Sequence, residues 1–131
     1  MASVNIAVIL ILVAMALYAV SVAMAATYMV GDSAGWTLPQ QPIYYDKWAA
    51  DKTFVVGDTL VFDYNPQYHN VLRVDQLGFQ SCNATSPIMR YASGRDSVAL
   101  QSPGHFFFLC GFPGHCQAGQ KVHIHIAIYP P

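Results

Sequence analysis

A segment near the C-terminus carries three kinds of side chain that bind transition metals. Cys110, His115 and Gln120 offer a thiolate, an imidazole and an amide oxygen, with four residues between neighbouring donors. A single loop rarely supplies every ligand of a small metal site, and His69 lies upstream at the end of a strand-like segment. Two His, one Cys and a weak fourth donor form the ligand set of a blue-copper electron-transfer site. The sequence therefore predicts one copper ion per chain, bound by these four side chains.

The types of donor also indicate what the ion would do. Cu(I) prefers soft thiolate ligands, whereas Cu(II) prefers nitrogen and oxygen donors, so a fixed set of both kinds suits either oxidation state. Phe106 to Phe108 and Phe112 would surround the ion with apolar side chains that exclude water. Zinc would also accept Cys and His, but a weak amide as fourth donor favours copper. No oriented nucleophile and base are visible, so we expect an electron carrier and not an enzyme.

Three cysteines leave one unpaired if the other two form a disulfide. If Cys110 binds the metal, Cys82 and Cys116 remain to form a disulfide in an oxidising compartment. A Cys110–Cys116 or Cys82–Cys110 disulfide with no metal is the alternative that the cysteines alone leave open. The other three metal donors favour the first arrangement.

The N-terminal segment has the composition of a targeting signal. Residues 1–25 contain no charged side chain, and the small residues of Ala23-Met24-Ala25 suit cleavage before Ala26. The sequence thus predicts a signal peptide over residues 1–25 and a secreted domain over residues 26–131. No Lys or Arg precedes the apolar run, and Ile6 to Val22 is long for the core of a signal, so an uncleaved anchor is the alternative.

Size and charge limit the remaining possibilities. A mature chain of about 106 residues is large enough for one hydrophobic core but not for two. Six basic residues against seven acidic ones give a formal net charge of −1, and they are scattered along the chain. This pattern has no electrostatic footprint for nucleic acid or for an anionic membrane. We therefore expect no nucleic-acid partner and no membrane association after the signal is removed. We also expect a monomer.

The segments that must hold the donors read mainly as short strands separated by turns. The clearest is Lys121 to Tyr129, in which Val122, Ile124, Ile126 and Ile128 alternate with polar residues. The other strand-like segments are Tyr28–Val30, Phe54–Val56, Thr59–Tyr64, Asn70–Asp75, Ile88–Ala92, Ser97–Gln101 and His105–Cys110. Only Tyr45–Ala50 and Asp75–Ser81 are plausible short helices. Many short strands with Gly and Pro turns predict an all-β antiparallel sandwich or barrel.

With these residues placed, the chain resembles the phytocyanins, the plant family of small blue-copper proteins. The resemblance extends over essentially the whole predicted mature chain. It is carried by Val30–Trp36, Trp48, Phe54–Asp58, Leu60–Phe62, Tyr64, His69–Val71, Cys82, Gly94, Asp96, Gly104, Phe107 and Cys110–Lys121. The early nodulin-like members of the family have lost copper ligands, whereas all four ligand positions are filled here.

The resemblance implies a Greek-key β-sandwich or barrel of the cupredoxin type, with about seven to eight strands and one or two short helices. It places the copper ligands at His69, Cys110, His115 and the axial Gln120, and the disulfide between Cys82 and Cys116. It also implies a secreted one-electron carrier in the apoplast or cell wall, with a small-molecule or protein redox partner. An extracellular cell-wall or signalling module whose copper is incidental is the alternative.

Two features of the chain are similar to different subfamilies. Gln120 in the axial position resembles the stellacyanins, whereas plantacyanins and uclacyanins carry Met there. The sequence stops at Pro131 without a Pro/Ser-rich stalk or a hydrophobic tail, as in plantacyanins. We therefore expect a stellacyanin-like site in a soluble, tail-less domain.

Four further residues lie outside the predicted copper site. Asn83-Ala-Thr85 is a sequon for N-glycosylation beside Cys82, which suits a secreted surface. His123 and His125 lie on one face of a predicted strand, where we expect a solvated surface pair. We expect His105 at the edge of a strand.

Overall fold

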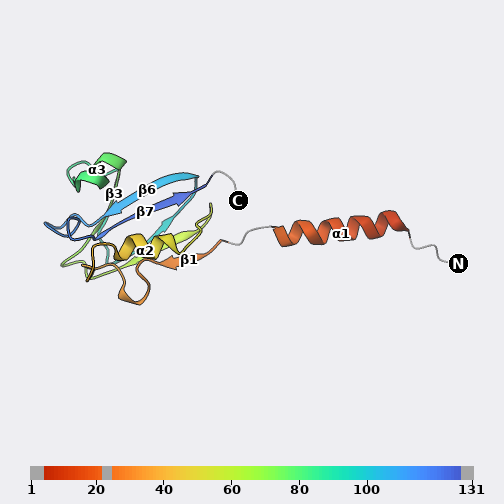
Figure 1. Ribbon diagram of the computed structural model, residues 1–131, viewed down its shortest axis with the longest axis horizontal. Helices are drawn as coiled ribbons and strands as arrows, with labels where there is room; N and C mark the ends of the chain where they lie inside the picture. Colours follow the sequence, from red (N-terminus) through yellow and green to blue (C-terminus); the bar gives the residue numbers. More distant parts are fainter. Residues whose placement is uncertain (1–4, 22–24, 128–131) are drawn as a thin grey trace.

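A computed structural model describes residues 5–21 and 25–127 of the chain, and its β-strands form two sheets that pack face to face (Figure 1). The first sheet has the order β1-β2-β5 and the second has the order β4-β3-β6-β7. The strands are β1 (Thr27–Met29), β2 (Thr59–Asp63), β3 (Val71–Val74), β4 (Met89–Tyr91), β5 (Arg95–Ala99), β6 (Gly104–Leu109) and β7 (Lys121–Ile126). The predicted β-sandwich is therefore confirmed.

The helices are short, apart from the one near the N-terminus. They are α1 (Ile6–Ser21), the 3-10 helix η1 (Asp32–Ala34), α2 (Tyr44–Ala50) and α3 (Gln76–Ser81). Helices α2 and α3 match the two short helices that the sequence predicts. The Asp75 side chain caps α3, because its Oδ1 accepts a 2.8 Å hydrogen bond from the backbone N–H of Gly78.

Alternation along β6 and β7 builds the core between the two sheets. Val122, Ile124 and Ile126 of β7 are buried, and so are Phe106 and Phe108 of β6, while the residues between them lie on the outer face. The two strands pair antiparallel from Gly104 opposite Ile126 to Leu109 opposite Lys121. The predicted period of two is confirmed as far as Ile126, and residues 128–131 lie outside the described part of the chain.

Aromatic side chains fill the part of this core nearest the predicted ligands. The ring of Trp36 lies 4.9 Å from that of Tyr45 and 5.0 Å from that of Phe62. The polar tips of these rings are also satisfied, since Trp36 Nε1 donates to the Asn70 carbonyl at 2.8 Å and the Tyr45 hydroxyl donates to the Gly35 carbonyl at 2.7 Å. Burial raises the pKa of Tyr45 to about 12, so this hydroxyl stays protonated and donates at any physiological pH.

The structure corrects two expectations about strand pairing. Strands β1 and β2 pair parallel, from Thr27 opposite Thr59 to Met29 opposite Val61, whereas the sequence predicted an antiparallel fold throughout. Two strands can run parallel only if the connecting chain crosses from one end of the sheet to the other, and the long segment that contains α2 does so. Phe54–Val56, predicted as a strand, forms only an isolated bridge from Phe54 to Ile126.

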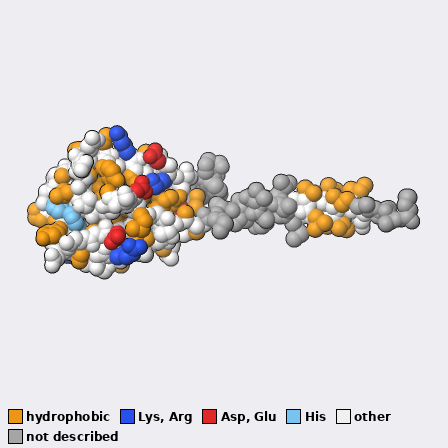
Figure 2. Space-filling model, turned by 90° about the horizontal axis from the view of Figure 1, so that it is seen from below, with side chains coloured by type: hydrophobic (Ala, Val, Ile, Leu, Met, Phe, Trp, Pro, Cys, Tyr) orange, Lys and Arg blue, Asp and Glu red, His pale blue; other side chains and the backbone are white. Residues whose placement is uncertain are grey.

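Helix α1 stands apart from the two sheets (Figure 1), and the side chains that are described in it are apolar (Figure 2). Its side chains from Ile6 to Val13 are exposed. Among the helices that the structure describes, none combines the length and the hydropathy that a membrane crossing requires. The expected signal peptide covers this helix, but Ala23 and Met24 of the expected cleavage motif lie outside the described residues.

Candidate metal centre

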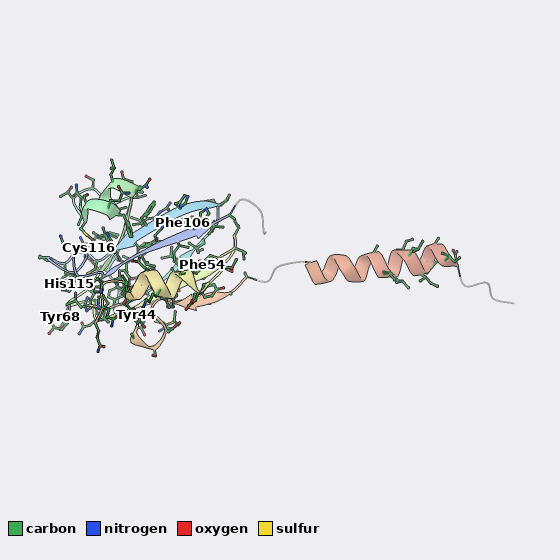
Figure 3. The ribbon with its side chains drawn as sticks, in the orientation of Figure 1. Tyr44, Phe54, Tyr68, Phe106, His115 and Cys116 are labelled. Atoms are coloured by element: carbon green, nitrogen blue, oxygen red, sulfur yellow. A yellow bond between two sulfur atoms is a disulfide. The ribbon has the colours of Figure 1, made fainter. Side chains whose placement is uncertain are left out.

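Strand pairing brings the four predicted ligands to one end of the sandwich. His69 lies just before β3, Cys110 directly follows β6, and Gln120 directly precedes β7. Leu109 pairs with both Leu72 of β3 and Lys121 of β7, so the ends of these three strands are neighbours. His115 reaches the same place from the loop between β6 and β7, and Figure 3 shows it at one end of the domain.

The four donor atoms converge on a common space. The ligand atoms of His69, Cys110 and His115 all lie within 4.8 Å of one another. Oε1 of Gln120 lies 3.2 Å from Nδ1 of His69 and 3.0 Å from Nδ1 of His115, while Sγ of Cys110 lies 3.5 Å from the latter nitrogen. Donors bound at about 2.0 to 2.3 Å to a shared ion at tetrahedral angles are about 3.3 to 3.6 Å apart. The spacing therefore fits one transition-metal ion.

The loop between the strands is held in this shape by its own backbone. The N–H of Cys110 donates to the Gln120 carbonyl at 3.0 Å, and the N–H of Gln120 donates to the His115 carbonyl at the same distance. Gly119 has a φ of 107°, and a Cβ there would lie 2.5 Å from the carbonyl oxygen of Pro42. Glycine is therefore needed both for the turn and for the close approach of the two segments.

Burial separates the donors from water to different degrees. Cys110 is 1% exposed and Gln120 is 0% exposed, while His69 is 9% exposed. His115 is half-buried, as is the neighbouring Phe112. At this end of the domain Figure 2 shows histidine surface surrounded by apolar side chains. An ion in the site would be shielded by protein and would approach the surface along the His115 ring.

The protonation of the donors follows from the same burial. It raises the pKa of the Cys110 thiol, although backbone hydrogen bonds from Asn70 and Phe112 partly oppose this effect. Burial lowers the pKa of His69, and the nearby His115 lowers it further, against the hydrogen bond with Gln120. Without an ion the site therefore holds a neutral thiol and a neutral imidazole. A bound cation would displace the thiol proton, because a coordinating thiol is deprotonated.

Gln120 is the donor whose position needs the most explanation. Its Nε2 is buried and has no hydrogen-bond partner within the described residues, while its Oε1 faces both imidazoles. An unpartnered buried amide N–H costs about 1 to 3 kcal/mol. An amide oxygen that faces two imidazole nitrogens, at the cost of its own unpartnered N–H, fits a site for a cation. The donor set itself, one thiolate with two imidazoles and a weak oxygen, suits copper.

Asn70 is a residue whose role the sequence analysis missed. It is 5% exposed, and its Oδ1 accepts a 2.7 Å hydrogen bond from the backbone N–H of Gly111. Its carbonyl accepts the hydrogen bond from Trp36. Asn70 thus ties the segment that carries His69 to the loop that begins at Cys110. In the sequence, the only sign of this role is that Asn70 is a polar residue next to the predicted ligand His69. Only the fold shows which groups Asn70 contacts.

Two of the three cysteines form a disulfide and the third is free, which agrees with the predicted role of Cys110 as a ligand. Cys82 and Cys116 form a disulfide with an S–S distance of 2.04 Å, and Cys110 is a buried free thiol. The disulfide joins the end of α3 to the residue next to His115, so it anchors the ligand loop to the outer face of the second sheet. A loop of this size restricts the unfolded chain enough to stabilise the fold by about 4 kcal/mol in the chain-entropy account.

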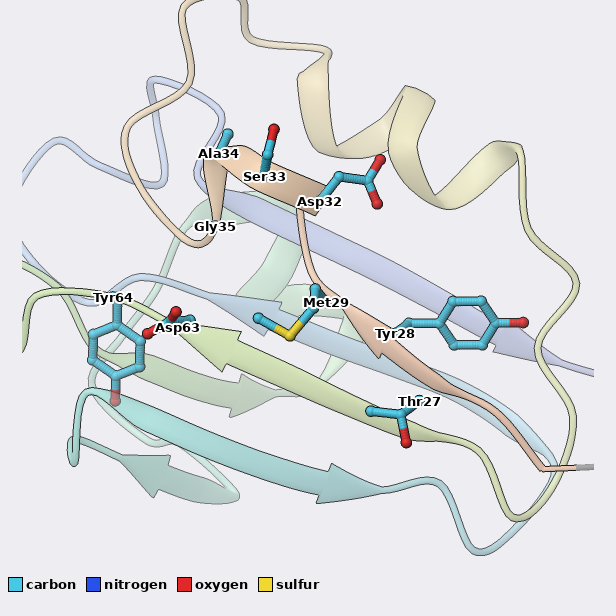
Figure 4. Close-up of a pocket in the computed structure, with 9 residues that line it drawn as sticks. All are labelled: Thr27, Tyr28, Met29, Asp32, Ser33, Ala34, Gly35, Asp63 and Tyr64. Atoms are coloured by element: carbon cyan, nitrogen blue, oxygen red, sulfur yellow. The ribbon is translucent and has the colours of Figure 1, made fainter.

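A separate hollow lies against the first sheet, away from these donors (Figure 4). It is lined by Thr27, Tyr28, Met29, Asp32, Ser33, Ala34, Gly35, Asp63 and Tyr64. It contains neither histidine nor cysteine, so its lining gives no alternative site for a soft or borderline metal.

Comparison with known proteins gives a consistent result. The sequence matches the plastocyanin-like domain family over residues 36–120. It is 48% identical to stellacyanin of Toxicodendron vernicifluum over 103 residues, which cover 77% of this chain and 96% of that protein. It is 45% identical to the basic blue protein of Cucumis sativus over 97 residues, which cover 74% of this chain and 95% of that protein.

A solved structure shows the same similarity in three dimensions. The structure of cucumber stellacyanin with Cu²⁺ matches with a TM-score of 0.74 and 31% identity, covering 82% of this chain and the whole of the other. The predicted cupredoxin type of sandwich is thereby confirmed.

Proposed function

We propose, from the premise that the chain belongs to the phytocyanin family of plastocyanin-like proteins, that it is a blue copper protein that carries single electrons. Copper would supply the redox chemistry by alternating between Cu(I) and Cu(II). The observation that carries the proposal is the convergence of Nδ1 of His69, Nδ1 of His115, Sγ of Cys110 and Oε1 of Gln120. These atoms offer both soft and borderline donors in one fixed arrangement.

Each side chain has a distinct role in the proposed site. Cys110 and the two histidines would hold the copper as strong ligands, and Gln120 would be the weak fourth donor. The donors are held by three adjacent strand ends and by backbone hydrogen bonds, so their positions change little when the charge of the ion changes. Electron transfer at a bound ion would then need little rearrangement, and burial of Cys110 and Gln120 would keep water from that ion.

The half-buried ring of His115 is the proposed route for the electron. It is the most exposed of the strong ligands, and it stacks on Phe112 with 5.9 Å between ring centroids. A partner that contacts this ring is separated from the ion by a single imidazole. The partner can be a small molecule or a protein, and the proposed chemistry at this site is electron exchange.

The proposal extends to processing and location. Residues 1–25 are a signal peptide and residues 26–131 are the mature domain, secreted as a monomer to the apoplast or cell wall. A disulfide at Cys82 and Cys116 supports an oxidising compartment. Asn83 is exposed, and its Oδ1 accepts hydrogen bonds from the Thr85 backbone at 3.0 Å and the Thr85 hydroxyl at 2.7 Å. This exposed sequon is accessible to glycosylation.

Visible and EPR spectra after addition of one equivalent of Cu(II) test the proposal. The wild type should show the intense band of thiolate-to-copper charge transfer, and Cys110→Ser should abolish it. His69→Ala and His115→Ala should weaken copper binding, whereas the matched control His125→Ala, on the outer face of β7, should keep the wild-type spectrum. A colourless wild type with bound stoichiometric copper would overturn the assignment.

A further inference from the structure

Three histidines gather on the outer face of the second sheet, separate from the proposed copper site. His105 of β6 pairs directly with His125 of β7, and Phe107 pairs with His123 (Figure 1 shows the two strands side by side). Because side chains alternate along a strand, all three histidines point away from the core that holds Ile124. The pairing register of β6 and β7 therefore brings the three histidines together, and the spacing along β7 alone does not reveal this cluster.

The rings in this cluster contact one another. Nδ1 of His105 lies 2.8 Å from Nε2 of His123, with 5.0 Å between ring centroids. The ring of His125 stacks on that of His105 at 4.3 Å and an interplanar angle of 12°. His105 lies near the start of β6, as expected, but it contacts both other histidines, and the partly buried His123 means that His123 and His125 are not a simple solvated pair.

We infer that His105 and His123 form a second metal site, a surface chelate for Cu(II). Two nitrogens bound at about 2.0 Å to one ion and at a right angle lie about 2.8 Å apart, which matches the observed separation. Imidazole donors without sulfur, at an open surface, favour Cu(II) over the other divalent first-row ions. Such an ion would be tetragonal, with water at its other positions, and would lack the blue thiolate band.

Binding requires a change of tautomer and a rotation of the two rings. When two neutral imidazoles share a hydrogen bond, one nitrogen donates and the other accepts. For both to bind a metal, the donating ring moves its proton to its other nitrogen, which faces away, and the two lone pairs turn toward the ion. Burial and the neighbouring histidines lower the pKa of His123, so the neutral form that binds metal is already favoured.

The charged groups around the cluster also permit a cation. His123 and His125 line a hollow with Asp46 and Lys52 of the segment around α2. The Lys52 amino group is directed elsewhere, since it donates to the Trp48 carbonyl at 3.1 Å and lies 4.5 Å from the Trp48 ring centroid.

The other nearby amino group is engaged as well. Lys121 donates to the Phe79 carbonyl at 2.7 Å. Asp46 therefore leaves a negative charge beside the histidines that a bound ion can balance.

The second site is separated from the first. His123 lies three residues beyond Gln120 along β7, which is about 10 Å at the rise of a strand. The two sites therefore can be occupied and removed independently. This makes the second site testable whatever the outcome at the first.

Copper titration followed by calorimetry and EPR tests the inference. After the first equivalent, wild-type protein should bind a second Cu(II) with a tetragonal EPR signal and no added blue absorbance. Loss of a residue that only supports a ligand commonly weakens binding about 10- to 100-fold, so His105→Gln and His123→Gln should each weaken the second event by at least about tenfold. Both should leave the first event and the urea midpoint unchanged.

Two further variants separate the alternatives. His125→Gln should retain the second event, because its ring stacks on His105 without sharing its nitrogen contact. His115→Ala should also retain the second binding event. This variant therefore separates copper binding at the histidine cluster from copper binding at the first site. A wild type that binds no second ion, or His105→Gln and His123→Gln variants that bind it unchanged, would overturn the inference.

Discussion

Replacing Gln120 with Met should raise the reduction potential of the bound copper. The amide oxygen is a harder donor than a thioether and favours Cu(II) over Cu(I). It lies 3.0 and 3.2 Å from the two ligand imidazoles, and Gln120 is 0% exposed, so no water can take its place. Loss of this oxygen therefore removes a stabilisation of Cu(II) that nothing else in the site replaces.

The size of the effect can be estimated from the strength of a polar contact to a charged group. Such contacts contribute about 1.5 to 3 kcal/mol. In a one-electron couple a tenfold change in relative stability, about 1.4 kcal/mol, corresponds to about 59 mV. Gln120→Met should thus raise the potential by about 65 to 130 mV. The blue band should persist, because Cys110 and both histidines are unchanged.

Voltammetry at fixed pH on the copper-loaded wild type and variant measures the shift. Gln117→Met is the matched control, since Gln117 is an exposed glutamine in the same loop. The control should keep the wild-type potential. An unchanged or lower potential in Gln120→Met would show that Gln120 is not the axial ligand, even if the other three residues bind copper.

Three other predictions concern stability and processing. Asn70→Ala leaves the partly buried N–H of Gly111 without its acceptor, so urea unfolding of the copper-free protein should show a loss of about 1 kcal/mol; an unchanged midpoint would exclude the role given to Asn70. Paired replacement of Cys82 and Cys116 by Ser should lower the free energy of unfolding by about 4 kcal/mol, and a loss below 1 kcal/mol would contradict the chain-entropy argument. Intact-mass analysis of the secreted protein should find Ala26 at the N-terminus, and recovery of the full-length chain instead would refute cleavage there.

The sequence predicted the parts of the fold that depend on local pattern. In β7, alternation shows which face is buried because Val122, Ile124 and Ile126 recur at every second residue. The donor set of the candidate site was predictable for another reason: Cys110, His115 and Gln120 lie in one loop, and few side-chain types bind copper.

The sequence could not predict the features that depend on which strands become neighbours. The parallel pairing of β1 with β2 arises from a crossover through α2, and neither strand encodes its partner. The contact of Asn70 with Gly111 and that of His105 with His123 join residues that are far apart in the chain. Both exist only because the register of β3, β6 and β7 brings those segments side by side.

The position of the copper itself tests the central claim most directly. Crystals of protein loaded with one equivalent of copper, measured at the copper absorption edge, should show one anomalous peak. We predict that it lies between Nδ1 of His69, Nδ1 of His115 and Sγ of Cys110, with Oε1 of Gln120 as a more distant neighbour. Bound copper that gives no peak among these atoms would contradict the account.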